Sequence, residues 1–181
     1  MIDSGQGRIG VSLDIKPHAY DPAANPELFE GVLARRLIAF IIDLCIVIVP
    51  VMFATVFILV FGLVTLGLGW ALFLLLTPAT VIWAICYFGF TLGAPASATI
   101  GMRVMDLEMR TWYGAPGYFV LGAVHAIGFW LSVSVLTPFI LLVCFFNERR
   151  RLLHDIALGT VVINNAQRAA LLRSFMAAAS A

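Results

Sequence analysis

The residue in this sequence whose position is most unusual is Asp43, about ten residues into a predicted apolar helix. At 1.5 Å per residue that is roughly 15 Å, which we expect to lie near the bilayer centre. An intramembrane Asp usually faces the bundle interior and has a partner. Arg36 lies seven residues earlier, on the same helical face. The two residues are either a site that handles ions or protons, or a buried pair that fixes helix packing.

The three histidines are weaker candidates for a functional site than Asp43 and Arg36. His125 is the one ionisable residue in the apolar segment 118–146, and it either partners Asp43 in a proton relay or bonds a backbone carbonyl. The pair His154-Asp155 would need further histidine ligands to form a metal centre. His18 and His125 are the remaining histidines, and we expect both at other depths. We therefore expect no metal, no cofactor, no catalytic residues and no enzyme, with Asp155 bonded to backbone amides or to Arg103.

The composition indicates a membrane protein. Of the 181 residues, 62% are hydrophobic and 12% are charged, and the mean hydropathy is +1.02. Soluble domains average about 45–50% apolar and about 25% charged residues, so a soluble domain is excluded, and so is a disordered chain. The net charge of +1 gives no reason to expect nucleic acid as a partner.

Charge-free stretches and alternation predict the elements. No Lys, Arg, Asp or Glu occurs from Leu44 to Met102 or from Thr111 to Asn147. The predicted elements are a polar arm over 1–30 with a strand at 9–15, helices over 33–61 (with a kink at Pro50) and 70–92, a strand at 105–110, an apolar segment over 118–146, a strand at 160–163 and an amphipathic helix in the tail 165–181. The expected fold is therefore an all-α polytopic membrane protein with two transmembrane helices, a third apolar segment and short cytoplasmic strands. The basic run 149–151 is expected to anchor a helix end at anionic headgroups.

The third apolar segment decides the topology. Three simple crossings would divide the eleven Lys and Arg residues six against five, whereas positive residues normally gather on the cytoplasmic side. A re-entrant segment puts all eleven on one side and lets the strand in 100–110 pair with 159–163. We therefore expect Tyr118–Phe146 to enter and return, broken around Ser132–Pro138. The alternative is one long tilted helix.

Three motifs in order resemble the RDD family of bacterial membrane proteins, which is named for one arginine and two aspartates. The motifs are Arg36-x-x-Ala39-x-x-x-Asp43, Ala98-Thr99-Ile100-Gly101-Met102-Arg103, and Leu153-His154-Asp155 followed by Gly159-Thr160-Val161-Val162. The resemblance covers residues 31–164 and identifies the naming residues as Arg36, Asp43 and Asp155. It departs from the family at Met102, where a lysine is frequent, and at His125, in a region where an arginine is frequent.

The resemblance implies a bacterial inner-membrane protein, and the distribution of Lys and Arg predicts a cytoplasmic N-terminus. Two functions remain open. Some family members are thought to act in transport, including sodium/proton exchange. The first hypothesis is therefore a cation/proton exchanger in which Asp43 takes turns binding a proton and a cation. The second is a non-catalytic accessory or assembly subunit. The expected partners are the lipid bilayer and a homo-oligomer or larger membrane complex.

Overall fold

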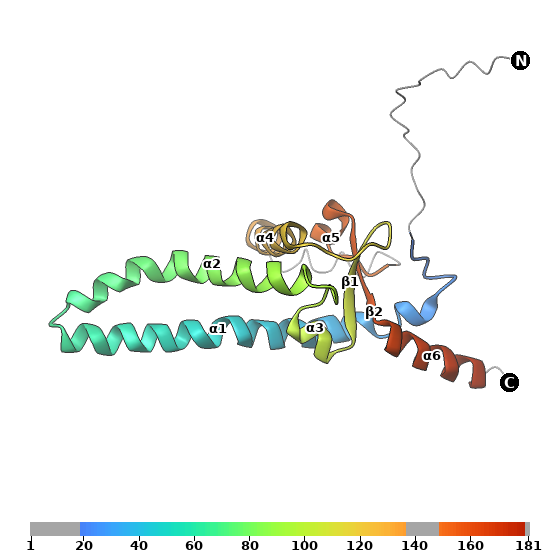
Figure 1. The fold of residues 1–181 in the computed structure, drawn as a ribbon, viewed down its shortest axis with the longest axis horizontal. Helices are drawn as coiled ribbons and strands as arrows, with labels where there is room; N and C mark the ends of the chain where they lie inside the picture. Colours follow the sequence, from blue (N-terminus) through green and yellow to red (C-terminus); the bar gives the residue numbers. More distant parts are fainter. Residues whose placement is uncertain (1–18, 137–148, 180–181) are drawn as a thin grey trace, which may run out of the picture.

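A computed structural model describes residues 19–136 and 149–179, and its dominant feature is a long helical hairpin (Figure 1). The arm residues 1–18, with the strand predicted at 9–15, lie outside the described residues. The elements are η1 (Pro26–Leu28), α1 (Val32–Val64), η2 (Leu68–Leu72), α2 (Phe73–Leu92), α3 (Ile100–Val104), β1 (Leu107–Thr111), α4 (Phe119–Leu136), α5 (Leu153–Leu158), β2 (Thr160–Asn164) and α6 (Ala166–Ala179).

Helices α1 and α2 are each long and apolar enough to cross a membrane. Pro50 lies inside α1, which runs on as one helix past the expected end at Phe61. The hairpin turns at Gly67, whose φ of +99° is a conformation that favours glycine. Trp70 packs on Gly62, where any Cβ would collide with the indole ring. The predicted pair of apolar helices is therefore present, with a 3-10 turn before α2 in place of its expected first residues.

The other end of the hairpin carries the elements that we call the head: η1, α3, β1, β2, α5 and α6 (Figure 1). Strands β1 and β2 pair antiparallel, with Leu107 opposite Asn164 and Thr111 opposite Thr160. Their apolar side chains are almost fully buried, among them Met109 and Val161, each at 0% exposure. The expected pairing of these two segments is confirmed. The strand predicted at 105–110 runs from Leu107 to Thr111, and the residues before it, Ile100–Val104, form α3.

Helix α4 packs against α2 through glycines. A Cβ on Gly89 would lie 2.7 Å from the Phe119 ring, and one on Gly122 would lie 2.8 Å from the Phe88 carbonyl oxygen. Small residues let two helices approach this closely, and Gly89 and Gly93 have the GxxxG spacing that is typical of such contacts. Helix α4 continues past Ser132, the start of the expected break, as far as Leu136. The rest of that break, with Pro138, lies outside the described residues.

The tail forms the predicted helix, α6. Its side chains Leu171 and Phe175 are exposed, and Ala169 is buried against the rest of the head. Arg173 pairs with Glu27 of η1 at 2.5 Å. The tail is thus held on the head by polar contacts as well as by Ala169.

Candidate functional site

Asp43 is buried, at 4% exposure, and accepts three hydrogen bonds from other elements. The Tyr87 hydroxyl of α2 donates to Oδ1 at 2.6 Å, and the Thr99 hydroxyl donates to Oδ2 at 2.6 Å. The Gly101 backbone N–H donates to Oδ1 at 2.8 Å. These four residues are called the Asp43 cluster. It joins α1, α2 and the start of α3 through one carboxylate.

The sequence at the start of α3 explains how this cluster forms. Thr99 is the N-cap of α3, and its hydroxyl also accepts a hydrogen bond from the Met102 N–H at 3.1 Å. Of the N–H groups in the first turn, that of Gly101 donates to Asp43 and that of Ile100 donates to the Tyr87 hydroxyl, so a carboxylate is well placed there. Gly101 has no room for a side chain, because a Cβ would collide with the Ala39 carbonyl oxygen of α1. The Thr-x-Gly spacing therefore lets α3 lie directly on α1.

Asp155 is completely buried and forms the second cluster. Arg36 of α1 pairs with its Oδ2 at 2.7 Å, and the Leu152 N–H donates to the same oxygen at 2.9 Å. The Thr160 hydroxyl donates to Oδ1 at 3.3 Å. With His125 and His154, these residues are called the Asp155 cluster. Its ion pair joins α1 to the segment that contains α5 and β2.

Arg151 also bonds to the segment that contains α5 and β2. Its guanidinium donates to the carbonyl oxygens of Thr160 and Asp155, each at 2.8 Å, and lies 4.9 Å from the centre of the Trp112 ring. It is only 5% exposed. The expectation that Arg151 anchors a helix end at lipid headgroups is therefore wrong, because its donors are used inside the head.

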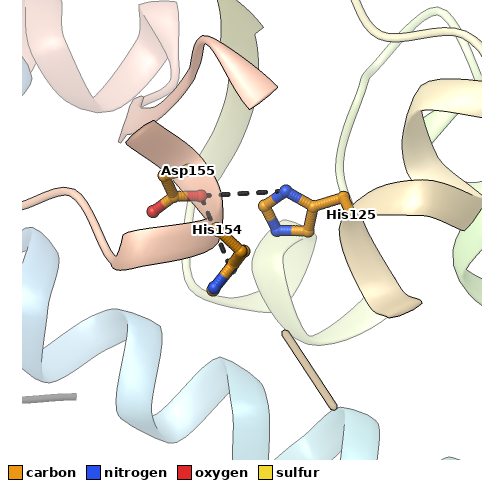
Figure 2. A group of neighbouring side chains, drawn as sticks. All are labelled: His125, His154 and Asp155. Atoms are coloured by element: carbon orange, nitrogen blue, oxygen red, sulfur yellow. Dashed lines mark ion pairs between the residues drawn. The ribbon is translucent and has the colours of Figure 1, made fainter. Parts of the chain in front are cut away.

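Two imidazoles lie beside Asp155 (Figure 2). His125 Nδ1 is 3.7 Å from Asp155 Oδ1, and His154 Nε2 is 3.6 Å from the same oxygen. The two rings meet edge to face, with centroids 4.6 Å apart. The expectation that His125 lies at a different depth from His154 is therefore wrong, because α4 packs against α5.

The charge states at the cluster follow from burial and from Arg36. Burial alone would raise the pKa of the Asp155 carboxyl, but the Arg36 guanidinium, together with the two imidazoles and the Leu152 N–H, holds that pKa well below its ordinary value. Burial lowers the pKa of the His154 imidazole to about 4, which Asp155 opposes only in part. At neutral pH, Asp155 is ionised and His154 is neutral.

The partners differ from those expected from sequence. Arg36 pairs with Asp155 and not with Asp43, because Asp43 faces α3. His125 lies at Asp155 and not at Asp43. Arg103 donates to the Ala98 carbonyl oxygen at 3.0 Å, and it is Arg36 and the Leu152 amide that bond to Asp155. The expected backbone amide at Asp155 is thus confirmed. The pairings of Asp43 with Arg36 or His125, and of Asp155 with Arg103, are wrong.

The sequence did not single out Tyr87 and Thr160, which belong to the clusters, or Arg151, which bonds the segment beside them. Tyr87 could have been noticed as a lone phenol in the apolar part of the second helix. Thr160 lies in a motif but was interpreted as a strand residue, and Arg151 was interpreted as part of a basic run. A buried arginine that bonds backbone carbonyls has no local sequence signal.

The comparisons with known proteins support the motif interpretation. The family model of the RDD family matches residues 31–159. This range contains Arg36, Asp43 and Asp155, and it covers more than half of the chain. No curated protein and no solved structure matches the chain.

Proposed function

The chain belongs to the RDD family of membrane proteins, and we propose that it is a non-catalytic subunit of a membrane assembly, either a homo-oligomer or a larger complex. In this proposal the naming residues Arg36, Asp43 and Asp155 hold the α1–α2 hairpin against the head. The observation that carries the proposal is that the buried carboxylates of Asp43 and Asp155 each accept three hydrogen bonds from protein donors.

The length of the hairpin supports a place for Asp43 at the edge of the bilayer. Residues 44–64, the part of α1 beyond Asp43, number 21 and span roughly 32 Å. This length matches a hydrocarbon core of about 30 Å. Asp43 and its partner Tyr87 then lie at the boundary near the head, and Trp70 lies at the far interface, where tryptophan is enriched.

Transport through Asp43 is the competing hypothesis, and the geometry favours it less. An exchanger needs a carboxylate that can release its partners, together with a polar path to it. The groove beside Asp43, between α1, α2 and α4, has a volume of 520 Å³. Its lining includes Leu44, Ile85 and Trp130, and no charged side chain among the described residues lines it. Asp43 is thus better suited to holding α3 than to exchanging ions.

The same groove supports an assembly role. It is apolar and open along the hairpin, with Ala84 of α2 and Ala126 of α4 in its walls. Beyond it, the hairpin exposes large side chains such as Phe53 at 73% and Phe57 at 62%. A helix of a second subunit would fill this groove, because close packing between helices is favoured in lipid.

We place the head in the cytoplasm of a bacterial cell and the hairpin in the inner membrane. Among the described residues, every arginine lies in the first turns of α1 or between Arg103 and Arg173, and none lies in the stretch 44–102 that forms most of the hairpin. Positive residues favour the cytoplasmic side. Pairing of β1 with β2 supports an even number of crossings, since both strands must share a compartment.

The size of the solubilised protein tests the assembly role. The chain has a mass of 19.7 kDa. Native mass spectrometry of the wild type, released from membranes in mild detergent, should show a species larger than one chain. Ala84→Phe should fill the groove and shift this species toward the monomer. Leu74→Phe changes a side chain that is 82% exposed on the same helix and serves as the control. A monomeric wild type would contradict the proposal.

A further inference from the structure

We propose that His125, His154 and Asp155 bind a divalent transition-metal ion of the zinc type where α4 meets α5. Each residue offers one ligand atom, and the three atoms lie within 4.8 Å of one another (Figure 2). This site goes beyond the proposed assembly role, which uses the Arg36 side of the Asp155 carboxylate.

The distances are close to those that a metal requires. Ligand atoms at 2.0–2.1 Å from a tetrahedral zinc ion lie about 3.4 Å apart. The two imidazole nitrogens lie 3.7 and 3.6 Å from Asp155 Oδ1. These separations are too long for direct hydrogen bonds, and a shift of a few tenths of an ångström brings the two nitrogen–oxygen distances to the metal-bound value. The three ligand atoms lie within 4.8 Å of one another, so metal binding also requires the two imidazoles to adjust toward each other.

His125 supplies an independent indication of a ligand. Its Nδ1 atom is buried and has no hydrogen-bond partner within the described part of the chain. A buried polar atom without a partner is unfavourable, and each such atom calls for an explanation. This atom points at Asp155 Oδ1, as Figure 2 shows. A metal ion between the two would give the nitrogen its missing partner.

The Asp155 carboxylate is oriented as a metal ligand would be. Its Oδ2 atom is held by Arg36 and by the Leu152 N–H. Its Oδ1 atom faces both imidazoles and, within the described residues, accepts a long hydrogen bond from Thr160. Such outer contacts fix the direction of a ligand before the metal arrives.

The His154 ring is also fixed in place. The Phe129 ring of α4 meets it edge to face, with centroids 5.5 Å apart. His154 is only 5% exposed. Its adjacent position to Asp155 on α5 means that both ligands come from one turn, while His125 comes from α4. The metal would therefore bridge the third apolar segment to the head.

The donor set selects the kind of ion. Two imidazoles and one carboxylate suit zinc and its neighbours among the transition metals. Magnesium and calcium prefer oxygen ligands and more of them. Three protein ligands leave at least one position for water or another ligand, as in zinc sites that are not closed.

Metal titration of the full-length protein tests the site. The chain carries a tag without histidine, is purified in detergent, is stripped with a chelator, and is titrated with Co²⁺. We expect one Co²⁺ per chain, with the visible absorption of a low-coordinate nitrogen- and oxygen-ligated ion, and displacement by Zn²⁺ but not by Mg²⁺. His125→Asn and His154→Asn should each weaken binding at least about tenfold. His18→Asn, which removes the remaining histidine, should leave binding unchanged.

Two further measurements separate loss of ligands from loss of fold. Circular dichroism and elution volume of each metal-free variant should match those of the wild type. If either variant fails to fold, X-ray absorption of the zinc-loaded wild type decides, and we expect a nitrogen and oxygen shell with imidazole scattering. A wild type that binds no Co²⁺, equal binding by a folded histidine variant, or a zinc shell without imidazole would each overturn the proposal.

Discussion

Arg36 and Asp155 form an ion pair across 119 positions of sequence, with Nη2 2.7 Å from Oδ2. The carboxylate is fully buried and the arginine side chain is 14% exposed. The next residue, Arg35, forms a similar pair with Asp106 at 3.0 Å, but that carboxylate is 46% exposed. Neighbouring arginines thus make one buried and one surface pair. Comparing the two ion pairs therefore tests how much burial of the carboxylate contributes to the stability of the fold.

Asp155→Asn should destabilise the protein by about 3–5 kcal/mol, because removing one partner leaves the Arg36 charge buried and uncompensated. Asp106→Asn should cost no more than about 1 kcal/mol, because exposed pairs contribute little. The left-handed φ of +51° at Asp106 is also well tolerated by Asn. Denaturant unfolding in micelles measures both variants. Equal losses of unfolding free energy in the two variants would show that the buried Arg36–Asp155 pair does not stabilise the fold more than the surface pair does.

Tyr87→Phe should cost about 1–3 kcal/mol, since it removes a buried donor from Asp43 without changing the ring. The control is Tyr118→Phe, whose side chain is 59% exposed. The same unfolding experiment compares the two phenols. A neutral Tyr87→Phe would mean that Asp43 does not depend on the phenol for its place in the fold.

Gly101→Ala should cost about 1–3 kcal/mol, because the added methyl group meets the Ala39 carbonyl and lies 2.9 Å from the Asp43 carboxyl carbon. Helix α3 would have to move away from α1. Val104→Ala, at a 63% exposed position of α3, serves as the comparison. Hydrogen exchange of the α3 amides should increase in the glycine variant alone, and unchanged protection there would contradict the close approach of the two helices.

The outline of the fold could be predicted from the sequence, because charge-free runs and alternation are local signals. The stretch 44–102 located the hairpin, and alternation around Met109 located β1. Helix α3 was missed because five residues are too few for a helical period. Its signal was Thr99 as an N-cap, with Gly101 placed for close packing.

Most members of the two clusters could be predicted from the sequence, but the contacts between them could not. Arg36 and Asp43 are near in sequence and share a helix, so they were expected to interact. In the structure each faces a different part of the chain: Asp155 for Arg36, and Thr99 for Asp43. His125 reaches His154 only because α4 packs on α5, a contact that no local pattern specifies.

In the proposed role, Asp43 holds α1 to α3 and does not carry ions. Everted vesicles with a pre-formed pH gradient test it most directly, with sodium, lithium or potassium added to wild type, Asp43→Asn and Asp106→Asn at equal expression. We expect no cation-dependent collapse of the gradient in any of the three beyond that of vesicles without the protein, together with reduced thermal stability of Asp43→Asn alone. Collapse with the wild type and with Asp106→Asn, but not with a stably folded Asp43→Asn, would contradict the claim and establish exchange through Asp43.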